Sequence, residues 1–338
     1  MIGVGIVGLG PATQAIHLPT LARLADEFRV VNVVDIDEAT ARAVADPIDA
    51  GWSTSFGQLL ADERVDVVAV CSPHALHVAH VIASLQAGKA VLCEKPLTMD
   101  LAGLAALREA AGGATAPLMV GWMHAYDPVV EAAISSWSAD GNRASALRVS
   151  TVLPPNHRFE DAATEVLPRA PATAGGGEPA LREALLTLAI HDLPLVRRLL
   201  PDLSAPLQIT HASWRAPWGY LVLGRIGETR VELHASLGQP GGPAWTLEAI
   251  SPTASLTLDF PPSYVHVGSA TSRLARAGGR VDEQTAAPED GYDGEWRRMA
   301  AAIREGAVGA LDDALLDAEF AIALADAAGR WVGKARAA

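Results

Sequence analysis

The first 122 residues alternate short apolar runs with segments of helical periodicity. The apolar runs carry nonpolar residues on both of their faces, which is typical of strands in a parallel sheet that is covered on both sides. We expect strands at residues 2–7, 29–35, 65–72, 89–94 and 117–122, and helices at 38–46, 74–88 and 100–112, together with a first helical pattern that reaches Phe28. This alternation predicts a doubly wound α/β domain.

The pattern changes after residue 122. We expect helices at 127–137, 180–200, 294–305 and 315–331, and a strand at 144–153. Several strand candidates with short connections follow between Leu207 and Phe260, which favours an antiparallel sheet. The chain is therefore predicted to form two domains, 1–122 and 123–338.

Charge and cysteine content exclude several classes of function. The formal net charge of -13 argues against nucleic acid and against an anionic membrane surface as partners, because both need a basic surface. We expect no membrane span, since no apolar run is long enough, and no signal peptide, since the strand pattern starts at residue 2. Cys71 and Cys93 are the only cysteines, and we expect free thiols in a reducing, cytoplasmic environment.

The segment GLGPATQAIHLP, residues 8–19, follows the first predicted strand and opens the first helix. In this context Gly8 permits a tight turn, and Gly10 lets the backbone approach a diphosphate closely. The helix start at Ala12 and Thr13 supplies free N–H groups for the anion. Thr13 stands in the place of a third glycine, and its hydroxyl is a candidate donor to a phosphate oxygen. The alternative is a strand–turn–helix that holds no ligand.

Asp35 ends the second predicted strand, 25 residues after Gly10. A carboxylate at this point accepts hydrogen bonds from ribose hydroxyls and repels a 2′-phosphate, and Asp37 adds to the repulsion. NAD(H) is therefore favoured over NADP(H) as the cofactor. The alternative is a solvated acid beside a simple turn.

Three segments together resemble the glucose-fructose oxidoreductase, inositol dehydrogenase and MocA (Gfo/Idh/MocA) family. They are the opening segment, SPHALH at 72–77 and QAGKAVLCEKP at 86–96, and the resemblance is strongest over the first 128 residues. It implies a Rossmann domain followed by an α/β domain with a large, mostly antiparallel sheet that often serves oligomerisation, so a homo-oligomer is expected. The implied chemistry is hydride transfer between a nicotinamide and a sugar, cyclitol or related carbonyl compound.

The resemblance also implies roles for individual residues. It places Lys95 near the nicotinamide ribose and the reacting hydroxyl, with Glu94 shaping the turn, and it places Ser72, His77 and Trp122 beside the cofactor. For Lys95, the local sequence supports the role that the resemblance implies. A residue before a proline favours an extended backbone, and Lys95 follows a predicted strand. Open parallel sheets bind ligands at the carboxyl ends of their strands. An ammonium there stabilises an alkoxide or relays a proton. The alternative is a surface lysine on a loop.

Three histidines, His74, His77 and His80, are spaced three residues apart at the start of a predicted helix. Side chains at this interval drift around a helix, and no carboxylate or cysteine completes a ligand set. We therefore expect no metal site here, and packing or solvent exposure for His74 and His80.

The second half departs from the family pattern GGGxLxDxGxH. Its best match, EALLTLAIHD at 183–192, retains His191 but has Thr187 in the place of the aspartate. A threonine hydroxyl cannot act as a base at neutral pH, so His191 is expected to share the acid–base work with Lys95. The alternative for His191 is a satisfied helix histidine near a domain interface. His124 replaces an arginine of another family segment, and the loop at 154–159 is a candidate lid.

Three functions remain open on these observations. The first is an NAD(H)-dependent oxidoreductase that acts on a carbonyl or alcohol carbon of a sugar, a cyclitol or a natural-product intermediate, with Lys95 and His191 handling the proton. The second is a reductase of imines or activated C=C bonds on the same scaffold, because such substrates need less help from a carboxylate. The third is a protein that binds NAD without catalysis and acts as a sensor or partner.

Overall fold

The structure is a computed structural model that describes residues 1–113, 115–153, 178–216, 218–237, 244–262, 266–306 and 310–337. The candidate lid at 154–159 lies outside these residues. Contacts divide the described residues into two units, one within Met1–Gly121 and Tyr292–Glu319, the other within residues 122–153, 178–291 and 320–337. A segment near the C-terminus thus returns to the first unit, which the single expected boundary at residue 122 does not describe.

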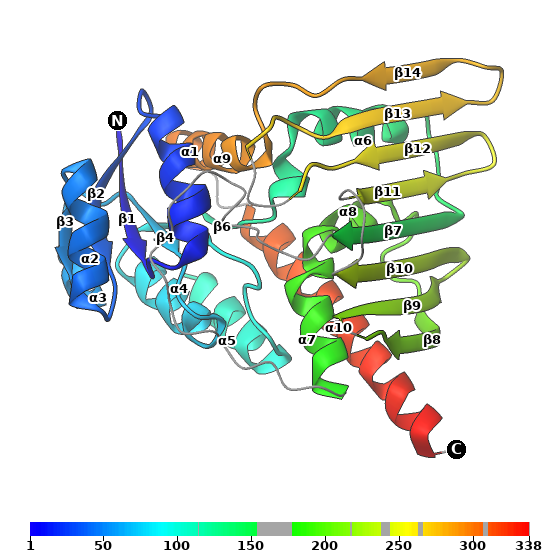
Figure 1. Ribbon diagram of the computed structural model, residues 1–338, viewed down its shortest axis with the longest axis horizontal. Coiled ribbons are helices and arrows are strands. Elements are labelled where there is room, and N and C mark those ends of the chain that lie inside the picture. The colour runs from blue at the N-terminus through cyan, green and yellow to red at the C-terminus, as the bar shows by residue number, and fades with distance from the viewer. Residues whose placement is uncertain are drawn as a thin grey trace. The chain divides into compact units, whose positions relative to one another are not determined.

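The first unit is built on a six-stranded sheet in the order β3-β2-β1-β4-β5-β6 (Figure 1). Its strands are β1 (Ile2–Val7), β2 (Phe28–Val34), β3 (Gly51–Ser53), β4 (Val67–Val70), β5 (Ala90–Cys93) and β6 (Leu118–Val120). Every neighbouring pair is parallel, which confirms the predicted doubly wound fold. The strand order reverses between β1 and β4, and open α/β sheets bind their ligands at the carboxyl ends of the strands at such a switch point. β3 was not expected, because its three half-buried residues are too few to show a period.

Helices flank this sheet (Figure 1). They are η1 (Thr13–His17, a π-helical turn), α1 (Leu18–Arg23), α2 (Glu38–Ala45), η2 (Asp46–Ile48), α3 (Phe56–Ala61), η3 (His74–Leu76), α4 (His77–Gln86), α5 (Leu101–Ala111) and most of α9 (Gly291–Glu305). The long helix α10 (Ala310–Ala337) follows α9. None of the helices in the described part of the chain is long and apolar enough to span a bilayer.

Helix α9 joins the first unit through Trp296, which is fully buried and meets Phe28 edge to face at 5.2 Å between ring centroids. Arg297 on the same helix forms an ion pair with Glu27. The helical pattern expected to reach Phe28 is therefore wrong, because α1 ends at Arg23 and Phe28 is the first residue of β2. Packing of Phe28 against a helix that is distant in sequence overrides its local periodicity.

The second unit is built on an eight-stranded sheet in the order β14-β13-β12-β11-β7-β10-β9-β8. Its strands are β7 (Ala146–Leu153), β8 (Leu207–Trp214), β9 (Trp218–Ile226), β10 (Thr229–Leu237), β11 (Ala244–Ile250), β12 (Ala254–Asp259), β13 (Thr271–Arg276) and β14 (Val281–Gln284). Among the strands that the structure describes, only β7 and β10 pair in parallel, so the expected large, mostly antiparallel sheet is confirmed. β13 and β14 were not expected, because polar and charged residues mask their alternation.

Helices of the second unit pack on this sheet. They are η4 (Met123–Tyr126), α6 (Pro128–Ala139), α7 (Glu178–Thr187), η5 (Ala189–His191) and α8 (Leu193–Leu199). Helix α6 lies against β12 and β13, and α7 lies against β8 and β9 (Figure 1). The single helix expected at 180–200 is wrong, since the chain forms α7, η5 and α8 there. Pro194 stands in the first turn of α8 and has no N–H to continue a helical ladder.

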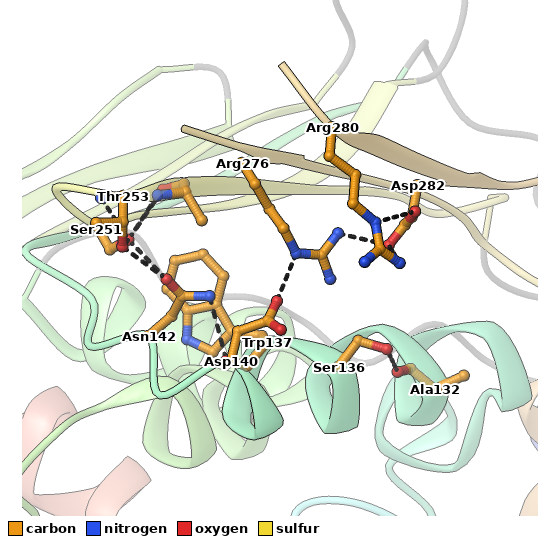
Figure 2. Close-up of polar contacts among 11 residues, drawn as sticks. Ala132, Ser136, Trp137, Asp140, Asn142, Ser251, Thr253, Arg276, Arg280 and Asp282 are labelled. Atoms are coloured by element: carbon orange, nitrogen blue, oxygen red, sulfur yellow. Dashed lines mark hydrogen bonds and ion pairs between the residues drawn. The ribbon is translucent and has the colours of Figure 1, made fainter. Parts of the chain in front are cut away.

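Both ends of α6 are tied to neighbouring segments by polar side chains. After its C-terminal end, Asp140 accepts a 2.6 Å hydrogen bond from Nε of Arg276 on β13, and Asn142 accepts hydroxyl hydrogen bonds from Ser251 and Thr253 at 3.1 and 3.0 Å (Figure 2). At its N-terminal end, the buried carboxylate of Asp127 accepts from three backbone N–H groups. These belong to Val129, Val130 and Ala270, at 3.0, 3.2 and 2.8 Å.

Replacing Asp127 by alanine leaves those three N–H groups in the core without their acceptor. We expect Asp127→Ala to lower the free energy of unfolding of the second unit by about 3 kcal/mol, measured by urea unfolding followed by tryptophan fluorescence. Asp100→Ala is the matched control, because the exposed Asp100 caps α5 through one bond from Gly103 N at 2.8 Å. Its loss should cost about 1 kcal/mol. Equal losses in the two variants would contradict the role of the buried cap.

Candidate functional site

The glycine turn after β1 lies tightly against the segment that follows β4. Gly8 has a φ of +89°, and a Cβ added to it would come within 2.6 Å of the backbone of Cys71 and Ser72. Side chains rarely adopt this φ, and no other residue fits the space. Gly8 therefore brings the chain to the switch point between β1 and β4, as the sequence predicted.

Asp35 and Thr13 hold this turn in shape. The buried Asp35 carboxylate accepts from Leu9 N at 2.8 Å through Oδ2 and from Asp37 N at 3.1 Å through Oδ1. The fully buried Thr13 hydroxyl donates to Gly8 O at 2.6 Å. A hydroxyl has one proton to donate, so the expectation that the Thr13 hydroxyl serves a phosphate oxygen is wrong. The sequence could not show this, because the competing acceptor is created by the turn itself.

The start of the first helix provides donors from the backbone. The first helical hydrogen bond runs from Gln14 N to Gly10 O at 3.1 Å. Pro11 has no N–H, and the N–H groups of Ala12 and Thr13 precede that first bond, as at any helix start. Such groups, together with the helix dipole, favour an anion. The geometry of the turn thus fits a diphosphate.

Lys95 lies in a turn after β5 that is fastened by Glu94. Oε2 of Glu94 accepts from Lys95 N at 3.0 Å, and Oε1 lies 3.0 Å from Nε2 of His17. Burial raises the pKa of Glu94, but the hydrogen bond from His17 and the ammonium of Lys95 outweigh burial, so the pKa is lowered and the carboxylate is ionised. The peptide bond between Lys95 and Pro96 is cis.

His17, the partner of Glu94 in this turn, is buried, and its ring is oriented by a hydrogen bond from Trp296. The indole Nε1 of Trp296 lies 3.2 Å from Nδ1 of His17, and an indole N–H can only donate. Nδ1 is therefore the acceptor in this contact, and Nε2 is the ring atom that donates to Glu94. Sequence analysis noted the segment that contains His17 but gave this residue no role. Its partner Trp296 is 279 positions away, so no local signal could reveal the contact.

His77 fastens the other side of the Lys95 turn. Its ring is fully buried, with Nδ1 2.8 Å from Pro96 O and Nε2 2.7 Å from Ser72 O. Both neighbours are carbonyl oxygens, which accept hydrogen bonds. The hydroxyl of Ser72 lies 2.9 Å from Nδ1 of His80. His77 and Ser72 thus bind segments of the chain to one another, and the position beside a cofactor that the family resemblance implies for them stays a prediction.

The remaining expected residues lie as follows. Trp122 is 1% exposed, and its indole N–H has no hydrogen-bond partner among the described residues. The position beside the cofactor that the resemblance implies for Trp122 stays a prediction. Within the part of the chain that the structure describes, no three His, Cys, Asp or Glu side chains gather as metal ligands.

The second unit contains a buried polar cluster that centres on Asp192. The carboxylate is 1% exposed and accepts from Trp245 Nε1 at 3.1 and 2.9 Å through its two oxygens. Oδ1 also lies 2.9 Å from Nδ1 of His124. His124 stacks on Phe260, with ring centroids 3.9 Å apart and planes at 16°. Sequence analysis recorded His124 only as a replaced arginine, and Asp192 only as the neighbour of His191.

His191 lies beside this cluster. Its ring is 7% exposed, with Nδ1 2.9 Å from Sδ of Met123 and its centroid 5.9 Å from that of His124. Tyr220 is fully buried, and burial together with the charge of Asp192 raises the pKa of its hydroxyl well above the usual range. Thr187, at the end of α7, donates its hydroxyl to Glu183 O at 2.8 Å. Thr187 and His191 do not share one helix, because α7 ends between them.

Residues 2–122 match the Gfo/Idh/MocA oxidoreductase family, described as having an NAD-binding Rossmann fold. The match covers the Rossmann domain and less than half of the chain. Inositol 2-dehydrogenase 3 of Saccharopolyspora erythraea is 35% identical over 127 residues, which are 37% of this chain and 37% of the relative. D-xylose 1-dehydrogenase (NADP(+)) 2 of Haloferax volcanii is 35% identical over 134 residues, 39% of this chain and 38% of the relative.

Similarity of fold to solved structures extends beyond the Rossmann domain, over nearly all of the chain. A solved structure of levoglucosan dehydrogenase in complex with NADH superimposes with a TM-score of 0.76, over 98% of this chain and 97% of the other, at 17% sequence identity. At this identity the likeness shows the fold alone. The curated relatives are matched over less than two fifths of their own length.

His77 and His74 form a matched pair that tests how the Lys95 turn is held, because one is fully buried and the other exposed. His77→Phe removes two hydrogen bonds to buried carbonyls, so we expect the free energy of unfolding to fall by about 2–4 kcal/mol and amide hydrogen exchange around Pro96 to speed up. His74→Phe should change neither. Similar exchange rates in the two variants would show that His77 does not hold the turn.

Proposed function

We propose that the protein is an NAD(H)-dependent oxidoreductase that moves a hydride between the nicotinamide and an alcohol or carbonyl carbon of a sugar, cyclitol or natural-product intermediate. The observation that carries the proposal is that the Gly8 turn, Asp35 and the Lys95 turn follow β1, β2 and β5 of one parallel sheet. They share the edge at which such sheets bind ligands. Dehydrogenases among the matched relatives support the reaction class.

The residues of the glycine turn fit a dinucleotide. A Cβ at Gly8 would collide with the backbone of Cys71 and Ser72, so only glycine allows this turn. The N–H groups of Ala12 and Thr13 would donate to a diphosphate. Asp35 would accept from the adenosine ribose. When bound, the nicotinamide supplies the acceptor or donor of the hydride.

We assign the transfer of the substrate hydroxyl proton to Lys95 and His191. The ammonium of Lys95 would stabilise negative charge on the substrate oxygen and exchange its proton, and Glu94 holds the backbone of Lys95 in place through its amide. His191 is the second acid–base group of the proposal. The hydroxyl of Thr13 is left out of the proposed site, because it donates to Gly8 O.

Substrates that need little acid–base help remain a second candidate class. Thr187 stands where the family pattern has an aspartate, and its hydroxyl proton is given to Glu183 O. A reductase of imines or activated C=C bonds on this scaffold would tolerate that loss. A protein that binds NADH and turns over neither class would be the sensor or partner instead.

We further infer that copies of the chain associate in the cytoplasm through the open face of the eight-stranded sheet. That face has a cavity of about 350 Å³ lined by residues of β7, β8, β9, β10 and β11, including Leu223 and Ile250. Ile250 is 41% exposed there. Two free cysteines, Cys71 and Cys93, agree with a reducing compartment.

Cofactor preference follows from the charge at the end of β2. We expect NADH to bind with a dissociation constant at least tenfold below that of NADPH, because Asp35 and Asp37 repel a 2′-phosphate. Energy transfer from tryptophan to the reduced nicotinamide measures both. Asp37→Asn should narrow the difference, and Glu63→Gln, which removes an exposed charge from the loop before β4, should not. Equal binding of NADH and NADPH to the unaltered protein would overturn the preference.

Lys95→Met removes the ammonium at nearly constant side-chain volume. We expect turnover of the preferred substrate from a panel of cyclitols, sugars and imines to fall at least a hundredfold, while NADH binding stays within threefold. The control is Lys89→Met, since Lys89 belongs to the same unit but donates to Asp62 O and Val65 O instead. Full turnover by Lys95→Met would remove Lys95 from the mechanism.

A further inference from the structure

Resting on the proposed function, we infer that His124 is a catalytic acid–base residue of the second unit and that Asp192 is its positioning residue. Together they would supply the carboxylate-assisted chemistry that the family pattern places at the position of Thr187. Four observations of the cluster around Asp192 carry this inference.

The first observation is that Asp192 is held ready to orient a partner. Trp245 donates to both carboxylate oxygens, at 3.1 and 2.9 Å, and the group is 1% exposed. An ionised carboxylate only accepts hydrogen bonds, so Nδ1 of His124, 2.9 Å away, is the donor. The proton of the neutral imidazole is thereby assigned to Nδ1, and Nε2 carries the lone pair of a base.

The second observation is that the ring of His124 is held on its other sides by aromatic residues. Phe260 stacks on one face at 3.9 Å, and Trp245 meets the ring edge to face at 4.8 Å, with planes at 82°. The orientation of His124 is thus determined by a hydrogen bond and two ring contacts. A base that keeps one orientation loses little entropy when it meets its substrate.

The third observation is that Nε2 of His124 is left available. No described residue forms a hydrogen bond with it, and Nε2 is not among the enclosed polar atoms that lack a partner. Nε2 is therefore an atom of the 4% exposed residue that is not fully enclosed by the protein. In the same chain, both ring nitrogens of His77 lie against carbonyl oxygens instead.

The fourth observation is that the charge of the cluster suits a proton acceptor. The titratable groups that face the cluster are Asp192 and His191 from the η5–α8 segment and Tyr220 from β9. Asp127 interacts with His124 electrostatically. Arg198 of α8 donates to Ala125 O at 3.1 Å. Tyr220 stays neutral because burial and Asp192 raise its pKa. Asp192 is then the negative charge nearest to an imidazolium on His124.

For alcohol oxidation, His124 would take up the proton in the final step in place of His191, while Lys95 would still stabilise the substrate oxygen. The substrate O–H bond would break and its proton would pass to Nε2 of His124, the electron pair of the C–H bond would leave as hydride to the oxidised cofactor of the proposed function, and a C=O bond would form. Asp192 stabilises the imidazolium. Carbonyl reduction is the reverse, with the imidazolium as proton donor.

The state of His124 can be measured without turnover. Long-range ¹H–¹⁵N spectra of protein with ¹⁵N-labelled histidine, assigned through His124→Gln, should show His124 with its proton on Nδ1. Trp245→Phe, which leaves His124 and Asp192 in place but removes the indole donor, should mix the two tautomers. A proton on Nε2 in the unaltered protein would overturn the inference.

Turnover then distinguishes catalysis from structure. On the best substrate of the panel, His124→Gln should lower kcat at least a hundredfold, abolish one limb of the pH profile, and leave NADH binding unchanged. Asp192→Asn should lower kcat less and shift that limb, and His234→Gln on β10, the same change outside the cluster, should be silent. His191→Gln shows which limb belongs to its neighbour.

Two negative outcomes are distinguishable. Wild-type kcat in His124→Gln refutes the role of His124 and leaves the proposed function standing. If the unaltered protein turns over no member of the panel, the proposed function fails and the role of His124 fails with it. Should His124→Gln not fold, Trp245→Phe replaces it, and unchanged kcat together with an unchanged tautomer would refute the role of the dyad.

Discussion

The hydrogen bonds of Glu94 are the constraint on which the first unit depends. The carboxylate of Glu94 is hydrogen-bonded both to the buried imidazole of His17 and to the backbone amide of Lys95. These two hydrogen bonds hold the backbone of Lys95 in place. Buried carboxylates are costly unless they are paired and hydrogen-bonded. The cost is offset here by two donors, which explains why the turn adopts one geometry.

Histidines have different tasks in the two units. In the first unit, both ring nitrogens of His17 and of His77 lie within hydrogen-bond distance of other protein groups, and each ring supports one side of the Lys95 turn. In the second unit, Nδ1 of His124 lies against the carboxylate of Asp192, and Nε2 forms no hydrogen bond with a described residue. The two units therefore use buried histidines differently.

The second unit keeps a carboxylate near its histidines although the position at 187 has lost one. Asp192 directly follows His191 in the chain, yet it orients His124, which is 68 residues away. Pro194 and the end of α7 break the helix that would have aligned positions 187 and 191 on one face. The break between α7 and α8 and the carboxylate of Asp192 thus lie in the same short segment of the chain.

The sequence by itself determined the parallel sheet, the glycine turn, the place of Asp35 and Lys95 at strand ends, and the antiparallel character of the second sheet. These features depend on local period, on the φ that only Gly8 tolerates, and on short motifs. Tertiary structure alone decided the partners of buried polar groups. The Thr13 hydroxyl donates to Gly8 O, Trp296 on α9 donates to His17, and Asp192 is hydrogen-bonded to His124. Hydrogen bonds of this kind join residues that are far apart in the chain or depend on the exact shape of a turn, and neither is encoded in a periodic pattern.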